Sequence, residues 1–160
     1  MTDTIAPKTG SYAETAEAVA KHLQPVVQQL VALQVNGKQA HWHVRGANFV
    51  AIHEFLDVVV DHAQEWADTA AERIVALGQP VDGRITSVAA AEPVNPKAGF
   101  KSAEDTIADV IAQIDLATSK VNTAIEALAE LDPSSQDVAI EIRRGLDKDR
   151  WFLFSHVATK

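Results

Sequence analysis

Residues 48–78 predict one long helix and read NFVAIHEFLDVVVDHAQEWADTAAERIVALG. Asn48 can cap the start of this helix, because its side chain can accept a hydrogen bond from the first turn. Gly78, with Pro80 behind it, ends the helix near Leu77. The predicted element is therefore close to eight turns long and carries most of the candidate chemistry of the chain.

Two pairs of candidate metal ligands lie on this helix, each pair four residues apart: His53 with Asp57, and Asp68 with Glu72. Residues at that spacing share a helix face, so each pair can clasp one cation. At about 100° per residue, all four side chains fall within an arc of roughly 100°. The helix therefore presents one metal-ligating face.

The two pairs cannot bind one ion within a single chain, because Asp57 and Asp68 lie about 16 Å apart along the helix axis. Each pair alone offers too few ligands for a tight site. A second copy of the helix, laid antiparallel across a two-fold axis near residues 62–63, would bring Asp57 opposite the partner's Asp68 twice. The spacing predicts a metal site shared between two chains.

His41, at the end of the preceding helix, could add a second imidazole beside His53. Two imidazoles and three carboxylates suit iron, zinc or manganese and are ill-suited to copper(I). The sequence has no Cys, so thiolate sites and disulfides are excluded. The alternative interpretation is a solvated acidic helix face with histidines that serve only packing or the surface.

Two further segments, one on each side of this helix, show apolar residues at a helical period. The first runs from about Ser11 to Val44, and Pro25 should either kink it or mark an early break. The other opens at Ser102, which with Asp105 resembles a capping box. A fourth helix starts at Asp132-Pro133, a cap followed by a first-turn proline, and runs to about Ala158.

Residues 78–101 form the longest connection, rich in Gly and Pro, with room for a short helix at Ser87–Ala91. No strand pattern occurs. The fold class expected is all-α, a four-helix bundle with one long crossover between the second and third helices, the connectivity of ferritin-like bundles. Residues 1–10 are expected to be a flexible tail and residues 11–160 a single domain.

The composition is that of a globular protein, with 160 residues, 47% apolar and 22% charged. Lys and Arg number 14 against 22 Asp and Glu, a formal charge of −8. Such a surface repels nucleic acid phosphates and attracts cations. The N-terminus lacks the apolar segment of a signal peptide, and no apolar run approaches the roughly 20 residues of a membrane span. We expect a soluble, cytoplasmic protein.

A dense set of motifs covers residues 38–78: Lys38-Gln39-Ala40-His41-Trp42, Arg45-Gly46-Ala47-Asn48-Phe49, His53-Glu54, Asp57, Asp68, Ala71-Glu72-Arg73 and Leu77-Gly78. With weaker matches at Trp151-Phe152 and His156, these motifs make the chain resemble the Dps proteins, or miniferritins. The resemblance spans most of the chain, and its motifs are highly specific.

The resemblance implies a hollow dodecamer of 23 symmetry, built from two-fold dimers, with ferroxidase sites at the dimer interfaces. Fe²⁺ would be oxidised there, preferably by hydrogen peroxide, and stored as Fe³⁺ mineral. Carried over residue by residue, His41, His53 and Asp57 would come from one subunit. Asp68 and Glu72 would come from its partner, in agreement with the two-fold argument from spacing.

The same resemblance implies roles for three further residues. Trp42 would sit beside the site, where an indole can intercept one-electron oxidants, or would serve interface packing alone. Asp137 matches the acidic position of the family's three-fold iron-entry pores, and Glu141 lies one turn further on, either in the pore or on a solvated face. Many family members have Asn where His43 stands, and we interpret His43 as a surface residue.

DNA-binding members of the family usually carry a Lys-rich tail. This chain offers only Lys8 against Asp3 at one end and Lys160 at the other, so we expect weak or no DNA binding. Three other functions compete with iron storage: metal-dependent hydrolysis of an amide or ester at the same ligands, structural packing of DNA, and a bundle whose metal site is vestigial.

Overall fold

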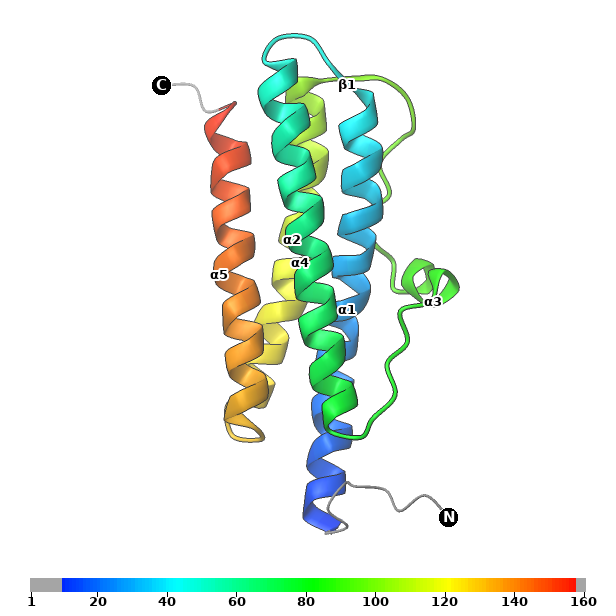
Figure 1. Ribbon diagram of the computed structural model, residues 1–160, viewed down its shortest axis with the longest axis vertical. Helices are drawn as coiled ribbons and strands as arrows, with labels where there is room; N and C mark the ends of the chain where they lie inside the picture. Colours follow the sequence, from blue (N-terminus) through cyan, green and yellow to red (C-terminus); the bar gives the residue numbers. More distant parts are fainter. Residues whose placement is uncertain (1–9, 158–160) are drawn as a thin grey trace.

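The computed structural model describes residues 10–157 of the chain. Over that range the protein is a bundle of four long helices with a short helix beside it (Figure 1). The long helices are α1 (Gly10–His43), α2 (Phe49–Ala76), α4 (Ala103–Leu128) and α5 (Pro133–Ser155), and the short one is α3 (Ile85–Ala90). α1 and α5 run in one direction, and α2 and α4 in the other. The expected all-α bundle with one long crossover is confirmed. The tail expected at residues 1–10 lies outside the described residues, except for Gly10, which opens α1.

α1 is the longest helix, with 34 residues, and it continues through Pro25. Of the two effects expected at Pro25, the early break does not occur. Proline removes one hydrogen bond of the helix. The turns around it are nevertheless held, because Leu23 and Val26 on either side are buried in the core.

α2 ends in a cap that Gly78 makes possible. Gly78 has a φ of 82°, in the left-handed region that favours glycine. Its N–H donates to Val75 O at 2.8 Å, and the N–H of Gln79 donates to Ile74 O at 3.2 Å. At the other end Asn48 is the N-cap residue, as expected, but its φ of 59° is left-handed and its side chain makes no cap hydrogen bond.

The crossover between α2 and α4 is fastened to α1 by side chains. Gln24 exchanges two hydrogen bonds with the backbone of Asp82, at 2.7 and 2.9 Å, and Gln29 Nε2 donates to Ala91 O at 2.9 Å. The short helix expected at residues 87–91 is present as α3. The crossover therefore lies along α1 rather than looping freely (Figure 1).

A pair of two-residue strands corrects the expectation that the chain has no strand. β1 (Val44–Arg45) and β2 (Lys101–Ser102) pair in parallel, with Val44 opposite Lys101. The Arg45 guanidinium also stacks over the Phe100 ring, 3.1 Å from its centroid. This pairing joins the turn after α1 to the end of the crossover.

The starts of α4 and α5 follow the sequence signals. Ser102 Oγ accepts from the Asp105 N–H at 3.1 Å, the first half of the expected capping box. Asp132 is the N-cap of α5, with Pro133 in the first turn, but its carboxylate makes no cap hydrogen bond. Instead it accepts from Arg73 Nη2 at 2.6 Å and from Ser135 Oγ at 2.5 Å, which ties α2 to this turn. α5 ends at Ser155 rather than near residue 158.

The four long helices enclose one apolar core. α1 packs on α2 and α4, and α5 packs on α4 and α2. The largest fully buried side chains are Leu23, Leu30, Leu33, Ile52, Leu56, Ile74, Ile107, Ile114, Leu128, Ile142, Leu146 and Leu153. Burying each stabilises the fold by about 1.5–3 kcal/mol. Within residues 10–157, no helix has both the length and the apolar character that crossing a membrane requires.

Candidate metal centre

The turn between α1 and α2 brings the two predicted imidazoles together. His41 lies in the last turn of α1 and His53 in the second turn of α2. The chain reverses between them through Gly46, with a φ of 102°, and Asn48, which is also left-handed. Glycine adopts the first of these conformations without a steric penalty. A tight reversal is what places residue 53 beside residue 41.

Each imidazole is held by the backbone of the other residue. His41 Nδ1 lies 2.8 Å from His53 O, and His53 Nδ1 lies 2.9 Å from His41 O. The rings stack with centroids 3.6 Å apart. A carbonyl oxygen can only accept, so both Nδ1 atoms carry the hydrogen. In the neutral imidazoles the lone pair is then on Nε2, the arrangement that metal-binding histidines use.

Asp57, one turn after His53, adds a carboxylate to this pair. Its Oδ1 lies 2.5 Å from Lys38 Nζ and 3.1 Å from His41 Nδ1. The hydrogen bond from Lys38 is the main reason that the pKa of Asp57 lies below its ordinary value, and burial opposes it. The carboxylate is therefore ionised at neutral pH and already paired with a cation of the chain itself.

Lys38 is a residue of the site to which the sequence analysis assigned no role. Its distance of three residues from His41 was the available signal, since that spacing puts both on one helix face. Only the structure shows that its ammonium group reaches Asp57 from the neighbouring helix.

Asp68 and Glu72 lie further along α2, and both are exposed. Asp68 borders a groove of about 620 Å³ whose walls include Val27 and Val31 of α1. Within the described part of one chain, no three His, Asp or Glu side chains form a group that could hold a metal ion. The structure brings His41 beside His53 and Asp57, which do not by themselves form a complete metal site, and it leaves the second predicted pair elsewhere on the same helix.

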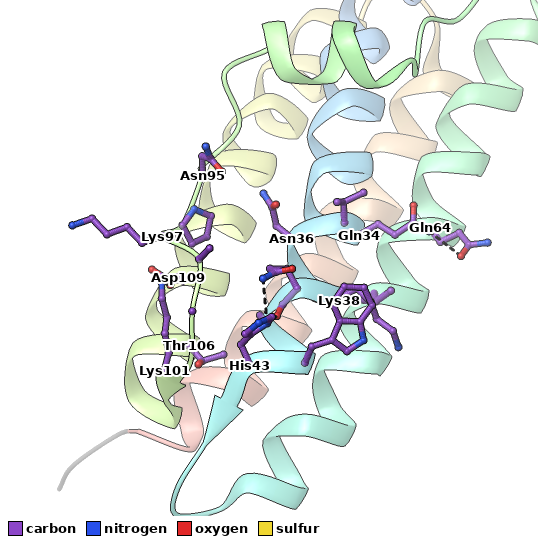
Figure 2. Close-up of a pocket in the computed structure, with 18 of the residues that line it drawn as sticks. Gln34, Asn36, Lys38, His43, Gln64, Asn95, Lys97, Lys101, Thr106 and Asp109 are labelled. Atoms are coloured by element: carbon purple, nitrogen blue, oxygen red, sulfur yellow. Dashed lines mark hydrogen bonds and ion pairs between the residues drawn. The ribbon is translucent and has the colours of Figure 1, made fainter.

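A larger groove of about 840 Å³ lies between α1, α2 and the end of the crossover (Figure 2). Trp42 borders it and is 62% exposed. His43 also borders it and is half-buried, with Nδ1 at 2.9 Å from Gln39 O and its ring 5.4 Å from Phe100. His43 therefore lies on the crossover side of α1, away from the His41–His53 pair.

The two predicted pore residues lie on α5, which begins at the end of the bundle opposite the imidazoles (Figure 1). Asp137 and Glu141 are both exposed and one helical turn apart. Neither forms a hydrogen bond or ion pair with another residue in the range 10–157. Their carboxylates are thus available to solvent cations.

A hydrogen-bonded pair that the sequence analysis missed joins α2 to α5. Asp149 is 2% exposed, and its two oxygens lie 3.1 and 3.0 Å from His62 Nδ1. Burial raises the pKa of Asp149, and the hydrogen bond from His62 offsets part of that effect. The His62 ring lies 5.2 Å from that of Trp66. The two partners are 87 residues apart, so no local spacing could have indicated the pair.

Known proteins share the architecture of this chain. The family model described as a ferritin-like domain matches residues 20–159. The DNA protection during starvation proteins of Agrobacterium fabrum and Mycolicibacterium smegmatis are each 32% identical to the chain. The first match covers 82% of both proteins, and the second covers 89% of this chain and 78% of the relative. A solved Dps structure from Microbacterium arborescens, in its high iron form, is 53% identical, with a TM-score of 0.91. That match covers 96% of this chain and 99% of the other.

The chain belongs to the Dps miniferritins of the ferritin-like family. The match includes α1 through α5, so this miniferritin has the bundle of its relatives over nearly its whole length. The resemblance noted at residues 38–78 is thereby confirmed at the level of the family. The relatives' names refer to protection of DNA during starvation, and the solved structure is of a high iron form.

Proposed function

We propose that this miniferritin takes up Fe²⁺ between two of its copies, oxidises it with hydrogen peroxide, and stores Fe³⁺ mineral inside a hollow homo-oligomer. The oligomer we propose is a dodecamer built from two-fold dimers. The observation that supports this function most is the mutual backbone clasp of His41 and His53, which occupies both Nδ1 atoms and leaves both Nε2 lone pairs free for a metal ion, with the Asp57 carboxylate beside His41. The high iron form of the Microbacterium arborescens relative supports iron as the substrate.

The proposed centre combines two imidazoles and Asp57 with the partner's Asp68 and the partner's Glu72. Nitrogen and carboxylate donors suit iron. Three anionic carboxylates stabilise Fe³⁺ more than Fe²⁺, because the attraction grows with the charge of the ion. Oxidation within this ligand set is therefore favoured over oxidation in water. A shared site also explains why one chain lacks a complete group of metal ligands among its described residues.

Lys38 gives the centre a defined metal-free state. Its ammonium group neutralises Asp57 at 2.5 Å, so the carboxylate is not left as an unpaired charge when iron is absent. An incoming Fe²⁺ ion competes with Lys38 for the same oxygen. Because the Lys38 stem is flexible, its ammonium group can swing toward the groove that it borders.

The reaction balances without further reactants beyond water. Two Fe²⁺ ions each give one electron to the same hydrogen peroxide molecule. Its O–O bond breaks, and two hydroxide ions form. The resulting Fe³⁺ hydrolyses to an oxyhydroxide mineral and releases protons. Trp42, which follows His41 in the last turn of α1, would donate an electron to stray one-electron oxidants. Asp137 and Glu141 would attract Fe²⁺ to its entry path.

Protection of DNA by this miniferritin is proposed to be chemical rather than by direct binding. Each chain carries a formal charge of −8, and a homo-oligomer multiplies that charge by the number of its chains. Phosphate backbones are repelled by such a surface at physiological salt. Removing Fe²⁺ and peroxide together would still limit hydroxyl radical damage to nearby DNA.

The direct test is to load the protein with Fe²⁺ without oxygen, add hydrogen peroxide, and follow ferric absorbance while sizing the particle. Replacing Asp57 or Glu72 by Ala should slow the fast phase by on the order of a hundredfold, because each removes one ligand of the centre. Glu126→Gln, which removes an exposed carboxylate on α4, is the matched control and should leave the rate unchanged.

Other outcomes would favour the competing functions. Rates unchanged in the Asp57 and Glu72 variants would indicate a vestigial site. Steady turnover of an amide or ester by the metal-loaded protein, without oxidant, would favour hydrolysis. A gel shift of DNA that weakens as salt increases would favour a direct DNA-binding role.

A further inference from the structure

The turn that joins α1 to α2 sets the distance between the two imidazoles of the proposed centre. His41 precedes this turn and His53 follows it, and each ring is bonded to the backbone of the other residue. The turn contains Gly46 and Asn48, whose φ angles of 102° and 59° both lie in the left-handed region. A residue other than glycine keeps such a conformation only where neighbouring contacts hold it. The turn therefore needs contacts that hold it in place.

The end of the crossover supplies such contacts. β2 pairs in parallel with β1, the first two residues of the turn, and Val44 in β1 is buried. Lys101 in β2 forms an ion pair with Asp109, which fixes the strand to α4. The Ser102 hydroxyl caps the start of the same helix. The turn is thus connected to α4 through β2.

Phe100, directly before β2, contacts the residues on both sides of Val44. The Arg45 guanidinium lies 3.1 Å from the centroid of the Phe100 ring, and the His43 ring lies 5.4 Å from it. A guanidinium is attracted to an aromatic face because that face carries the negative end of the ring quadrupole. Gly99, with a φ of 120°, allows the crossover to bend just before Phe100. One aromatic ring therefore holds the turn on both sides of β1's first residue.

The exposure of Phe100 argues against a role in the apolar core. Its side chain is 61% exposed, and among residues 10–157 it does not belong to the side chains packed on the core. Apolar burial stabilises a fold in proportion to the area removed from water. Phe100 removes little of its surface from water, so its contacts with Arg45 and His43 act on the turn. A change at Phe100 should then affect the turn more than the fold as a whole.

We propose that Arg45 and Phe100 are positioning residues for the metal centre, because their contact holds the turn that sets His41 beside His53. This inference rests on the proposed function, since it takes these two histidines as metal ligands. Without the Arg45–Phe100 contact the turn gains freedom, and the two imidazoles spend less time in the geometry that one ion requires. Affinity for the ion falls by the fraction of time that this geometry is lost.

Hydrogen–deuterium exchange of the metal-free protein tests whether the contact holds the turn. Phe100→Ala should speed exchange of the backbone amides of residues 44–49 by roughly two- to fivefold, the factor that corresponds to one exposed cation–π contact. Phe100→Tyr keeps the ring and should exchange like wild type. Ile85→Ala, which removes an apolar side chain of α3 that is 87% exposed, is the matched control and should leave these amides unchanged.

Co²⁺ titration of the same variants measures the consequence for the centre. Phe100→Ala and Arg45→Met should each weaken Co²⁺ binding by roughly two- to fivefold. The double variant should lose no more than either single variant, because both changes remove the same contact. At saturation the visible absorption of Co²⁺, which reports its ligand geometry, should match that of wild type. Phe100→Tyr should restore the wild-type affinity.

The two experiments separate failure of this inference from failure of the proposed function. Exchange in residues 44–49 that is as slow in Phe100→Ala as in Ile85→Ala would overturn the positioning role. So would faster exchange spread evenly over all four long helices, or losses of Co²⁺ affinity that multiply in the double variant. A wild-type protein that binds no Co²⁺ would refute the proposed centre, whereas faster exchange confined to the turn of its Phe100→Ala variant would still support the Arg45–Phe100 contact.

Discussion

Lys38 and Asp57 determine the charge of the proposed metal centre before any ion binds. Asp57 alone would place an exposed anion beside two imidazoles, and Lys38 pairs with it at 2.5 Å. Both side chains are partly exposed, so water screens their attraction and the ion pair is weak. A weak internal cation suits the proposed function, in which Asp57 would have to exchange Lys38 for each incoming Fe²⁺ ion.

Lys38→Met should therefore strengthen metal binding at neutral pH, on the order of two- to fivefold, because the metal no longer competes with an ammonium group. The pKa of Asp57 should rise toward its ordinary value once the Lys38 hydrogen bond is lost. Acid should then displace the metal at a higher pH than in wild type. Titration calorimetry with Co²⁺ at pH 7 and pH 4.5 measures both effects. Lys21→Met, an exposed lysine on the same helix, is the control, and an equal gain there would refute the competition.

Gly145 makes room on α5 for an aromatic side chain of α2. A Cβ atom at this position would lie 2.0 Å from Trp66 Cζ2, so the indole would have to move. We expect Gly145→Ala to lower the free energy of unfolding by about 1–3 kcal/mol, as overpacking of a core does. Chemical denaturation measures it. Combining it with Trp66→Leu should cost less than the sum of the two single changes, and strict additivity would contradict the clash.

At the scale of elements, helix existence and most helix ends could be predicted because their signals are local. Gly78 ends α2 and Ser102 opens α4 as expected. The β1–β2 pair could not be predicted, because two residues carry no period and the partners are 57 positions apart. At Pro25 the local signal was ambiguous, because proline allows a helix to break. The helix continues there because the neighbouring side chains are buried in the core.

The contact between His62 of α2 and Asp149 of α5 predicts how stability depends on pH. Burial raises the pKa of Asp149, so its contribution to stability is fully present below the unfolded pKa of about 3.9 and is lost as pH rises through the folded value. His62→Gln is used as the background, because Gln can still donate to the carboxylate but does not titrate. In the His62→Gln background, the free energy of unfolding with Asp149 minus that with Asp149→Asn should fall as pH rises from 4 upward. Urea unfolding at several pH values checks this, and a pH-independent difference would contradict it.

At the scale of the whole molecule, the bundle and the proximity of His41 to His53 could be predicted from the sequence, because a short turn joins the two helices that carry them. The complete ligand set stays a prediction. It could not predict Lys38 as the partner of Asp57, or Asp149 as the partner of His62, since both pairs depend on which helices pack and in what rotation. The pairing of two chains stays a prediction. Spacing along α2 supports it, and one chain cannot display it.

Subunit complementation tests whether the centre is assembled from two chains. One variant lacks both imidazoles, His41→Ala with His53→Ala, and another lacks the second acidic pair, Asp68→Asn with Glu72→Gln. Each should be inactive alone, because every centre in it is incomplete. When the two are dissociated and reassociated together, half of the pairs are mixed, and each mixed pair holds one centre with every ligand. Statistics then predict recovery of about a quarter of the wild-type initial rate of Fe²⁺ oxidation.

The matched control mixes the imidazole variant with Asp57→Asn. These changes lie in the same half of the centre, so every centre in a mixed pair has a defective half and no activity should return. Recovery in the first mixture and none in the second requires that the ligands come from different chains, because a centre built within one chain would remain damaged in both. Equal recovery in both mixtures, or in neither, would contradict the shared centre while leaving the fold and the family unaffected.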